Sequence, residues 1–448
     1  MKRREFIGAS SLGTAAVLYG LTGCAEKQTS SHSPPMSGTG SLSLEGLSLQ
    51  NLKKQYKYDL FDDFLPFLDR YVIDHEYGGF MCNTDRDGTN ITKNKNAWFE
   101  GRGIWVYSFL YNNLENNQKH LEAARKSVDF ILKHKPAGDD LWPRSFTEQG
   151  SILSGAPGNI YGDIFIATGF SEYSRASGET RYWDTAKQIL LKCIRLYDDP
   201  NYFPEASQTY LGKEGPSLPG GRIIGHWMVL LRLATQMLEQ KKDPEIESVA
   251  DLCVNAIMKA HHITDFDLTI EIINHDMSIP TDPLSQLVYT GHAIETFWMV
   301  LYEAVRKKDK NLFDLAAQRF KRHVDIAWDD VYGGAFRALI HVDKNIWAVD
   351  KVLWLQEEIL IGSLFIIEHT GADWAKEMFV RTFLYVQDKF PLKQYGFPLW
   401  NLNSDRKVSF KRHSGRIGNF HHPRHLMLNL LSLDRMIERK GKVSGIFT

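Results

Sequence analysis

Three histidines near the C-terminus are the residues best suited to proton chemistry. The segment Gly418–Leu426 contains His421, His422 and His425, and an apolar run follows it. Pro423 favours a helix start here, because proline lacks the N–H that a first helical turn leaves unpaired. An imidazole at such a helix mouth can carry protons near neutral pH. A hydrated helix start with incidental histidines is the alternative.

An arginine among aromatic residues is the second candidate. Arg102 follows Trp98 and Phe99 near the start of a predicted helix. A guanidinium group in this setting could hold a sugar oxygen or a developing enediolate. The alternative is an ion pair with Glu100 or another acid.

A histidine and a glutamate three residues apart form the third candidate. His292 and Glu295 share one face of a predicted helix, which also carries Trp298. Glu295 could orient the imidazole and raise its basicity. The spacing also occurs in metal sites, but His261 and His262 lie on another hairpin, so we predict no metal. A buried hydrogen-bonded pair without chemistry is the alternative.

The fourth candidate is the segment Lys351–Glu358. Glu358 lies about one helical turn after Trp354, so the indole face and the carboxylate could grip a polyhydroxy ring together. Glu357 is adjacent and must point elsewhere. A capping or ion-pairing role for Glu358 inside a helix bundle is the alternative.

Helices arranged in pairs must position these residues. Short polar breaks separate the members of a pair, which predicts antiparallel neighbours. Six such hairpins predict an all-α fold, an (α/α)6 barrel with its long loops at one end around one pocket; an open solenoid would need polar capping repeats. Apolar residues recur at helical spacing in twelve segments: 47–72, 98–115, 117–135, 158–177, 179–199, 222–238, 244–262, 285–308, 310–327, 350–370, 371–389 and 420–440.

Three glycine-containing loops resemble one another. They span residues 74–80, 329–336 and 394–397. Glycine permits the tight turns that lead into short strands, so we predict β-turns followed by short β-hairpins at these places.

The N-terminal segment predicts export. Residues 1–24 combine Arg3 and Arg4, a short apolar stretch and Leu21–Cys24, a pattern typical of a twin-arginine lipoprotein signal with Cys24 lipidated. An ordinary cleaved signal is the alternative. We predict that residues 25–44 form a flexible tether and that residues 45–448 form one domain. We therefore expect a protein on the periplasmic or outer-membrane surface whose only membrane contact is its lipid anchor.

Composition limits the remaining function classes. With 53 basic and 54 acidic residues the net charge is −1, which argues against nucleic-acid binding. The spacing of Cys82, Cys193 and Cys253 differs from the CxxC spacing of zinc sites. A single disulfide between two of them is the alternative that the sequence leaves undecided. The aromatic content of 12% suits a carbohydrate cleft, although a large helical core would also use it.

In their order along the chain, these stretches resemble the N-acylglucosamine 2-epimerase family, which includes cellobiose 2-epimerases and aldose–ketose isomerases. The resemblance covers nearly all of the chain after the tether and implies the (α/α)6 barrel. It also implies that Arg102, His292, Glu358 and His421 are the essential residues. The matching motifs are Trp98-Phe99-Glu100-Gly101-Arg102, Gly291-His292-x-x-Glu295-x-x-Trp298, Trp328-Asp329-x-x-Tyr332-Gly333-Gly334, Lys351-x-x-Trp354-x-Gln356-x-Glu358 and Phe420-His421-x-Pro423-Arg424.

The implied reaction inverts C2 of an open-chain reducing sugar through an enediolate. Two histidines would exchange the C2 proton on opposite faces, while the arginine and the carboxylate hold the intermediate, without a metal or nicotinamide cofactor. The partner is a small carbohydrate, and the chain is expected to be a monomer or a homodimer. The expected substrate contacts are Trp98, Glu295, Trp298, Trp354, Gln356, Arg424, Trp400 and His226.

The sequence also departs from the family. Cellobiose 2-epimerases carry a third histidine on the middle helix, whereas His226 lies about one turn from that place and no glutamate follows it. Gln356, in contrast, is the residue type expected in the cellobiose 2-epimerase branch. The sequence therefore does not decide which sugar is the substrate. The alternatives are an aldose–ketose isomerase, a glycoside hydrolase using Asp163 and Glu358, and a non-catalytic glycan-binding lipoprotein.

Overall fold

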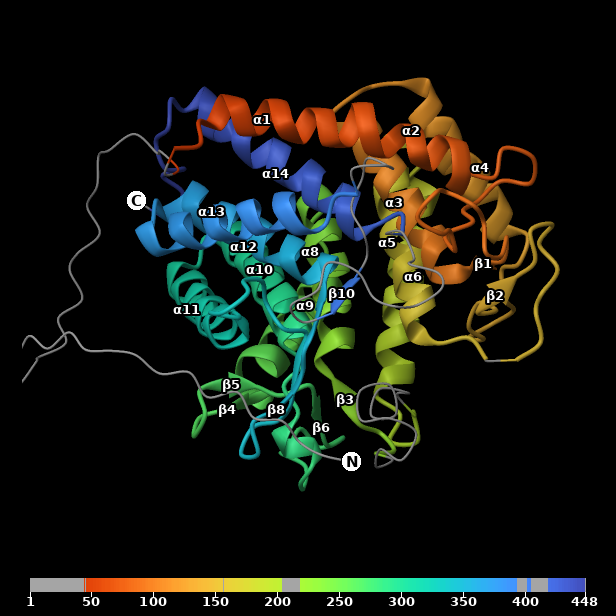
Figure 1. Ribbon diagram of the computed structural model, residues 1–448. Helices are drawn as coiled ribbons and strands as arrows, with labels where there is room; N and C mark the ends of the chain where they lie inside the picture. The colour runs from red at the N-terminus through yellow and green to blue at the C-terminus, as the bar shows by residue number, and fades with distance from the viewer. Residues whose placement is uncertain are drawn as a thin grey trace, which may run out of the picture. The chain divides into compact units, whose positions relative to one another are not determined.

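The computed structural model describes residues 44, 46–155, 157–203, 218–392, 401–403 and 418–447, which all belong to one compact unit. Helices dominate this part of the chain (Figure 1). Among the described helices, none combines the length and the apolar character that crossing a membrane would require.

Six helices form an inner layer. Helix α12 shows why: its residues from Leu353 to Glu368 are buried without interruption, so every side of this helix meets protein. A helix that is apolar on all sides must lie in the interior. The inner helices are α3 (Ala97–Asn113), α5 (Ile160–Ser177), α8 (Ile224–Gln240), α10 (Thr290–Lys307), α12 (Leu353–Thr370) and α14 (His421–Glu438).

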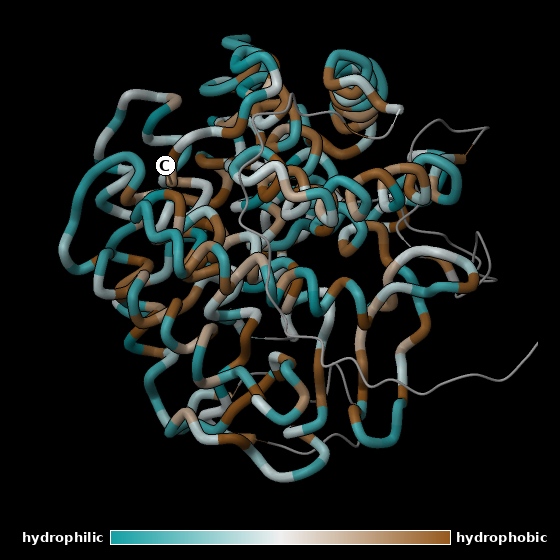
Figure 2. Tube along the Cα trace, turned by 90° about the vertical axis from the view of Figure 1, so that its left-hand side faces the viewer, coloured by the Kyte–Doolittle hydropathy of each residue, from teal (hydrophilic) through white to brown (hydrophobic). Residues whose placement is uncertain are grey.

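The outer layer consists of amphipathic helices. Hydrophobic and hydrophilic residues alternate along them (Figure 2), as expected for helices with one buried face. The outer elements are the first helical segment (α1 Leu49–Lys57, η1 Tyr58–Phe64, α2 Leu65–Phe67 and η2 Leu68–Val72), α4 (Gln118–Leu132), α6 (Thr180–Tyr197), α9 (Pro244–Asn255) with η3 (Ala256–Ala260), α11 (Lys310–Ala327) and α13 (Asp373–Lys389).

The inner helices follow one another around a ring. Each packs against the next in chain order, and α14 also contacts α3, which closes the ring. Each outer helix packs on an inner one, α1 on α14 and α4 on α3, for example (Figure 1). The twelve predicted helical segments are all present among the described residues, and the predicted (α/α)6 barrel is confirmed.

Local sequence signals fix the helix ends. Asn96 and Asn159 cap α3 and α5, where their side chains accept hydrogen bonds from Trp98 N and Gly162 N. Gly178 and Gly371 end α5 and α12 in the left-handed conformation, with φ of 75° and 68°. This conformation favours glycine and turns the chain back toward the next helix.

Short antiparallel strand pairs extend the loops. The strands β3, β4, β5, β6 and β8 gather at one end of the helices, toward the bottom of Figure 1. A short 3-10 helix, η4, spans Leu284–Gln286. The pairs are β1 (Lys95–Asn96) with β2 (Ser145–Phe146), β3 (Arg222–Ile223) with β6 (Ile272–Ile273), β4 (His262–Ile263) with β5 (Leu268–Thr269), β7 (Ala338–His341) with β8 (Ile346–Ala348), and β9 (Asp350–Val352) with β10 (Asn401–Asn403).

Two of the three similar glycine loops form the same turn. In 74–80 and 329–336, the aspartate N–H donates to the carbonyl of the second glycine, at 3.0 and 2.8 Å. A buried lysine pairs with each aspartate, Lys95 at 2.7 Å and Lys351 at 2.5 Å. Each turn thus anchors the start of the following inner helix. The third loop, 394–397, lies outside the described residues.

Three helix starts were predicted too early. Residues 222–223 and 350–352 form strands, and the segment predicted to begin at 285 has only the short 3-10 helix η4 before its α-helix begins at Thr290. These short extended stretches carry apolar residues directly before a buried helix. Their side chains continue the apolar pattern, so periodicity alone does not separate them from the helix.

Candidate active site

The two predicted catalytic histidines both lie beside one tryptophan. His292 lies in the first turn of α10, and His421 is the first residue of α14. The indole of Trp354, on α12, has its centroid 6.1 Å from the His292 ring and 5.3 Å from the His421 ring. A Cβ on Gly291 would lie 2.5 Å from this indole, so the close approach requires glycine there. The fold thus brings together residues that are 129 positions apart.

Glu271 holds His292. Its Oε1 lies 2.9 Å from His292 Nδ1. Glu271 belongs to the short link that joins β5 to β6 in the sequence, and it is almost completely buried. Burial alone would lower the pKa of His292, but the charge and hydrogen bond of Glu271 raise that pKa above its ordinary value. Glu271 rather than Glu295 therefore orients His292, while the charge of Glu295 adds a smaller effect that also raises the pKa of His292. Glu295 does share the helix, but its carboxylate faces another partner.

His421 has a carboxylate and a cation beside it. Its Nδ1 lies 2.9 Å from Glu358 Oε1 and 3.0 Å from a guanidinium nitrogen of Arg424. Burial and the positive charge of Arg424 lower the pKa of His421 well below its ordinary value. The two histidines therefore have opposite pKa shifts.

Glu358 is the centre of a buried network. Trp298 Nε1 donates to Glu358 Oε2 at 2.6 Å, and Arg424 donates to Glu358 Oε1. The same Arg424 nitrogen donates to Glu295 Oε1 at 2.7 Å. Burial raises the pKa of Glu358, although Arg424 opposes this effect. The carboxylate thus orients His421 and Arg424 from within the protein, and Trp298 orients the carboxylate.

The guanidinium group of Arg102 is surrounded by aromatic rings. Burial lowers its pKa to about 10, so the guanidinium stays charged at neutral pH. Its Nε has no hydrogen-bond partner, and no ion pair to it is found among the described residues. The cation instead lies over the rings of Phe165 (4.2 Å), Phe420 (4.8 Å) and Trp98 (5.3 Å). Arg424 contacts the same Phe420 ring, at 4.6 Å, which joins Arg102 to the histidine network.

Glu100 does not pair with Arg102. Its carboxylate accepts hydrogen bonds from Ser127 Oγ at 2.6 Å and from Phe80 N at 3.0 Å. Gln356 has the equivalent position at the second glycine turn. Its Oε1 accepts a hydrogen bond from the N–H of Ala335 and its Nε2 donates one to the carbonyl of Ala335, both at 2.9 Å. Gln356 is fully buried in this position. Its predicted role as a substrate contact is therefore replaced by a structural one.

His226 lies near His292 but in a different environment. It stacks on Tyr197, with ring centroids 5.1 Å apart, and its Nε2 lies 3.3 Å from the hydroxyl of Tyr202. Burial, with a smaller effect of nearby His292, lowers the pKa of His226 to about 3. The ring is therefore neutral in the physiological range. Trp400 and Cys24 lie outside the described residues.

The acid pair expected of a glycoside hydrolase is not formed. Asp163 is buried in the first turn of α5, where Lys192 of the outer helix α6 forms an ion pair with it at 2.7 Å. The backbone N–H of Trp142 donates to its other oxygen at 3.0 Å. Asp163 thus joins neighbouring structural elements, whereas Glu358 belongs to the histidine network.

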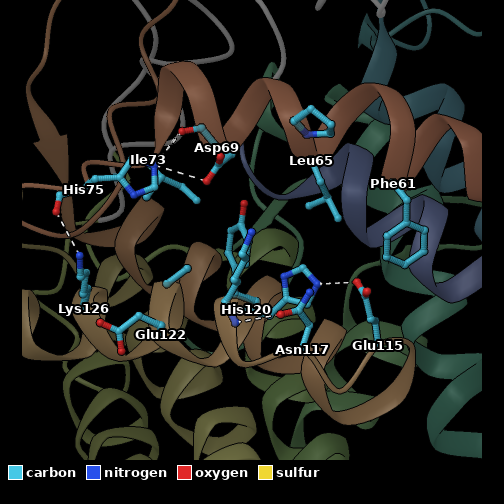
Figure 3. Close-up of a pocket in the computed structure, with 14 residues that line it drawn as sticks. Phe61, Leu65, Asp69, Ile73, His75, Glu115, Asn117, His120, Glu122 and Lys126 are labelled. Atoms are coloured by element: carbon cyan, nitrogen blue, oxygen red, sulfur yellow. Dashed lines mark hydrogen bonds and ion pairs between the residues drawn. The ribbon is translucent and has the colours of Figure 1, made fainter.

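A separate groove lies in the outer layer. It has a volume of about 500 Å³ and lies between the first helical segment and α4 (Figure 3). His120 faces Glu115 across 3.0 Å there, and Lys126 donates to the carbonyl of His75. Its lining residues are distinct from the Trp354-centred cluster.

The cluster suits proton transfer at a carbon next to a carbonyl. Two imidazoles are each held through Nδ1 by a buried carboxylate, so Nε2 is the nitrogen that would reach a reacting atom. A buried guanidinium nearby can stabilise an oxyanion. We missed Glu271 from the sequence because it lies 21 residues before its histidine, in a short loop.

Comparisons with known proteins agree with this assembly. The model of the family described as N-acylglucosamine 2-epimerase (GlcNAc 2-epimerase) matches residues 78–424. N-acylglucosamine 2-epimerase of Bos taurus is 26% identical over 404 residues, covering 85% of this chain and 93% of the relative. Cellobiose 2-epimerase of Dictyoglomus turgidum is 23% identical and covers 71% and 82%.

Solved structures share the fold. Cellobiose 2-epimerase from Bacillus thermoamylovorans matches with a TM-score of 0.74 at 15% identity, covering 85% of this chain and 99% of that chain. A family 76 glycoside hydrolase from Bacteroides thetaiotaomicron matches less well, with a TM-score of 0.55 at 11% identity and coverage of 88% and 79%.

Proposed function

The chain belongs to the N-acylglucosamine 2-epimerase family, and from this premise we propose that it inverts C2 of a reducing sugar in its open-chain form. The observation that carries the proposal is the pair His292 and His421, whose rings both lie beside the Trp354 indole. Inversion at C2 needs one proton-transferring group on each face of that carbon, and these two imidazoles are the groups we propose for the two faces.

The proposed mechanism has two proton transfers. Nε2 of one histidine removes the C2 proton, and the electrons move toward the C1 carbonyl to give an enolate, which is an enediolate where C2 carries a hydroxyl group. Nε2 of the other histidine returns a proton to the opposite face, and the roles reverse in the reverse reaction. Arg102 would stabilise the oxyanion through its charge. Glu271 and Glu358 hold the two rings in place through Nδ1.

Proton NMR in D2O tests this proposal. Free GlcNAc, mannose, glucose and cellobiose are each incubated with the full chain, and the signals of H2 and of the two epimers are followed. We expect loss of the H2 signal together with appearance of the C2 epimer for at least one sugar. Accumulation of a ketose would support the aldose–ketose isomerase instead. Release of new reducing ends from an oligosaccharide would support a hydrolase.

The substrate class is proposed from the relatives. The curated relatives include N-acylglucosamine and cellobiose 2-epimerases. We propose either an N-acylglucosamine/N-acylmannosamine pair or a sugar ended by glucose or mannose. Higher kcat/KM for GlcNAc than for cellobiose selects the first, and the reverse order selects the second.

We also propose that Cys24 carries a lipid anchor outside the cytoplasm. The support is the sequence pattern of residues 1–24. Cys24→Ala should release the protein from the membrane fraction. A variant that stays in that fraction would contradict the anchor.

A further inference from the structure

A second cluster of ionisable groups lies beside the first. α12 carries the neighbours Glu357 and Glu358, and α14 carries the neighbours His421 and His422. Successive residues of a helix point in different directions, so only one of each pair can face Trp354. His421 lies beside Trp354 and its Nδ1 contacts Glu358, whereas Glu357 contacts His422 Nδ1. His425 Nδ1 lies 3.6 Å from the same oxygen of Glu357.

This second cluster faces the first helical segment. The ring of His422 packs edge-on against Phe64 of η1, with centroids 4.9 Å apart. His425 Nε2 lies 2.9 Å from the hydroxyl of Tyr56 on α1, which also accepts a hydrogen bond from Asn429 at 3.0 Å. α1 and α14 lie side by side here (Figure 1). The cluster is therefore enclosed by three helices.

The hydrogen bonds within the cluster leave two buried polar atoms unpaired. Glu357 is fully buried, and His425 is 4% exposed. Glu357 Oε2 and His425 Nδ1 have no hydrogen-bond partner. A buried polar atom without a hydrogen-bond partner destabilises the folded state. Glu357 and His425 belong to a group of three residues, with His422, whose ligand atoms lie within 4.8 Å of one another, so one bound cation would have a carboxylate and two imidazoles within reach.

We propose that Glu357, His422 and His425 bind a divalent transition-metal ion of the Zn²⁺ class. One carboxylate oxygen and two imidazole nitrogens offer ligand atoms within 4.8 Å of one another. Two histidines and one glutamate form a known donor set for zinc. The contact of His425 Nε2 with Tyr56 is the outer hydrogen bond that orients a ligating imidazole.

The neighbouring cluster provides a matched control. Glu295, Glu358 and His421 also place ligand atoms within 4.8 Å of one another. There, however, Arg424 donates hydrogen bonds to both carboxylates, so a guanidinium already supplies the positive charge. The Glu357 cluster has one glutamate and two histidines and the Glu295 cluster has two glutamates and one histidine, and only the Glu295 cluster contains an arginine that bonds to its carboxylates. Only the cluster without the arginine should bind a metal.

The ion would connect α12 and α14 through its ligands, and α1 through Tyr56. Because His421 and Arg424 lie on the same helix as both histidine ligands, the ion would fix the rotation of α14. It would thus support the histidine network without touching a substrate. The inference is independent of the proposed reaction, because metal binding is measured without any sugar.

The experiment uses the full chain, freed of metal with a chelator and then dialysed against Co²⁺ or Zn²⁺. We expect about one equivalent of Co²⁺ per chain, with visible absorption bands typical of four- or five-coordination. X-ray absorption of the Zn²⁺ form should show two imidazoles among the ligands. Failure to bind a stoichiometric ion would overturn the proposal whatever the variants do.

Substitutions locate the ion. His425→Ala and Glu357→Gln should each weaken Co²⁺ binding by roughly a hundredfold or more, whereas Glu295→Gln should leave it unchanged. Circular dichroism selects the variants that remain folded. If His425→Ala does not fold, His425→Gln, which keeps a polar side chain of similar reach, takes its place. Binding that survives in folded His425 and Glu357 variants, or that is lost in Glu295→Gln, would overturn the assignment.

Discussion

The two histidines of the candidate site have the same role in the proposed reaction but different surroundings. His292 faces an anion, Glu271, which raises its pKa. His421 faces Glu358 together with Arg424, and burial and this cation lower its pKa. A carboxylate lies at Nδ1 of the imidazole in both places. At His292 burial is outweighed by the charge and hydrogen bond of Glu271, with a smaller effect of Glu295, which raise the pKa, whereas at His421 burial and the charge of Arg424 together lower it.

Removing either histidine should have the largest effect. Replacing His292 or His421 by Asn removes the proton carrier of one face while keeping a side chain of similar polarity. We expect net epimerisation to fall by roughly 100- to 10,000-fold in each case. Initial rates measured by NMR in both directions check this. A variant with more than about a tenth of the original rate would contradict the need for two groups.

Arg102 should affect both faces alike. The guanidinium stabilises an intermediate that is common to both directions, so Arg102→Ala should slow exchange from both epimers, by roughly 100- to 1000-fold. Arg102→Lys keeps a charge but loses the planar group, and should recover part of the rate. A loss confined to one epimer would show that Arg102 serves one histidine rather than the intermediate.

Glu271 should control the pH at which His292 titrates. Its charge keeps His292 protonated to higher pH, so Glu271→Gln should move the His292-dependent limb of the kcat/KM profile to lower pH. The rate at the optimum should fall by roughly 10- to 100-fold, as expected for one hydrogen bond to a charged group. Trp298→Phe, which removes the N–H donor to Glu358 on the other side, is the control and should leave this limb in place. An upward shift in Glu271→Gln would contradict the assignment.

His226 should have the smallest effect of the three histidines. With a pKa of about 3 it stays neutral in the working range, and its ring stacks on Tyr197. We expect His226→Asn to lower kcat by less than about tenfold, the value of a lost hydrogen bond or contact. A loss as large as that of His292→Asn would place His226 among the proton carriers.

The sequence predicted the helices and much of the site because both depend on local patterns. The regular recurrence of apolar residues located the twelve helical segments. Glycines and short polar stretches located the turns between them. His292, His421, Glu358 and Arg102 lie at or near the starts of inner helices, where a motif can identify them. The structure brings these four residues near one another, and their catalytic roles stay predictions.

The partners of these residues depended on contacts that no local pattern contains. Glu295 is three residues from His292, which suggested a pair, but Arg424, 129 residues away, binds Glu295 instead. Glu271 came from a loop with no motif.

A usable signal existed for Gln356. The two glycine turns are alike, and Gln356 follows Lys351 at the same interval at which Glu100 follows Lys95. Both side chains accept a hydrogen bond from the backbone N–H after their turn. We predicted a substrate contact for Gln356, although this repeat already indicated a structural role.

Deuterium exchange from separate epimers tests the two-face mechanism most directly. Each purified epimer is incubated in D2O with His292→Asn or with His421→Asn, and loss of its H2 signal is followed before any conversion. The account predicts that each variant retains exchange from one epimer and loses it from the other, with the two variants showing opposite preferences. Equal loss from both epimers in both variants, or full epimerisation in either, would contradict the claim that one histidine serves each face.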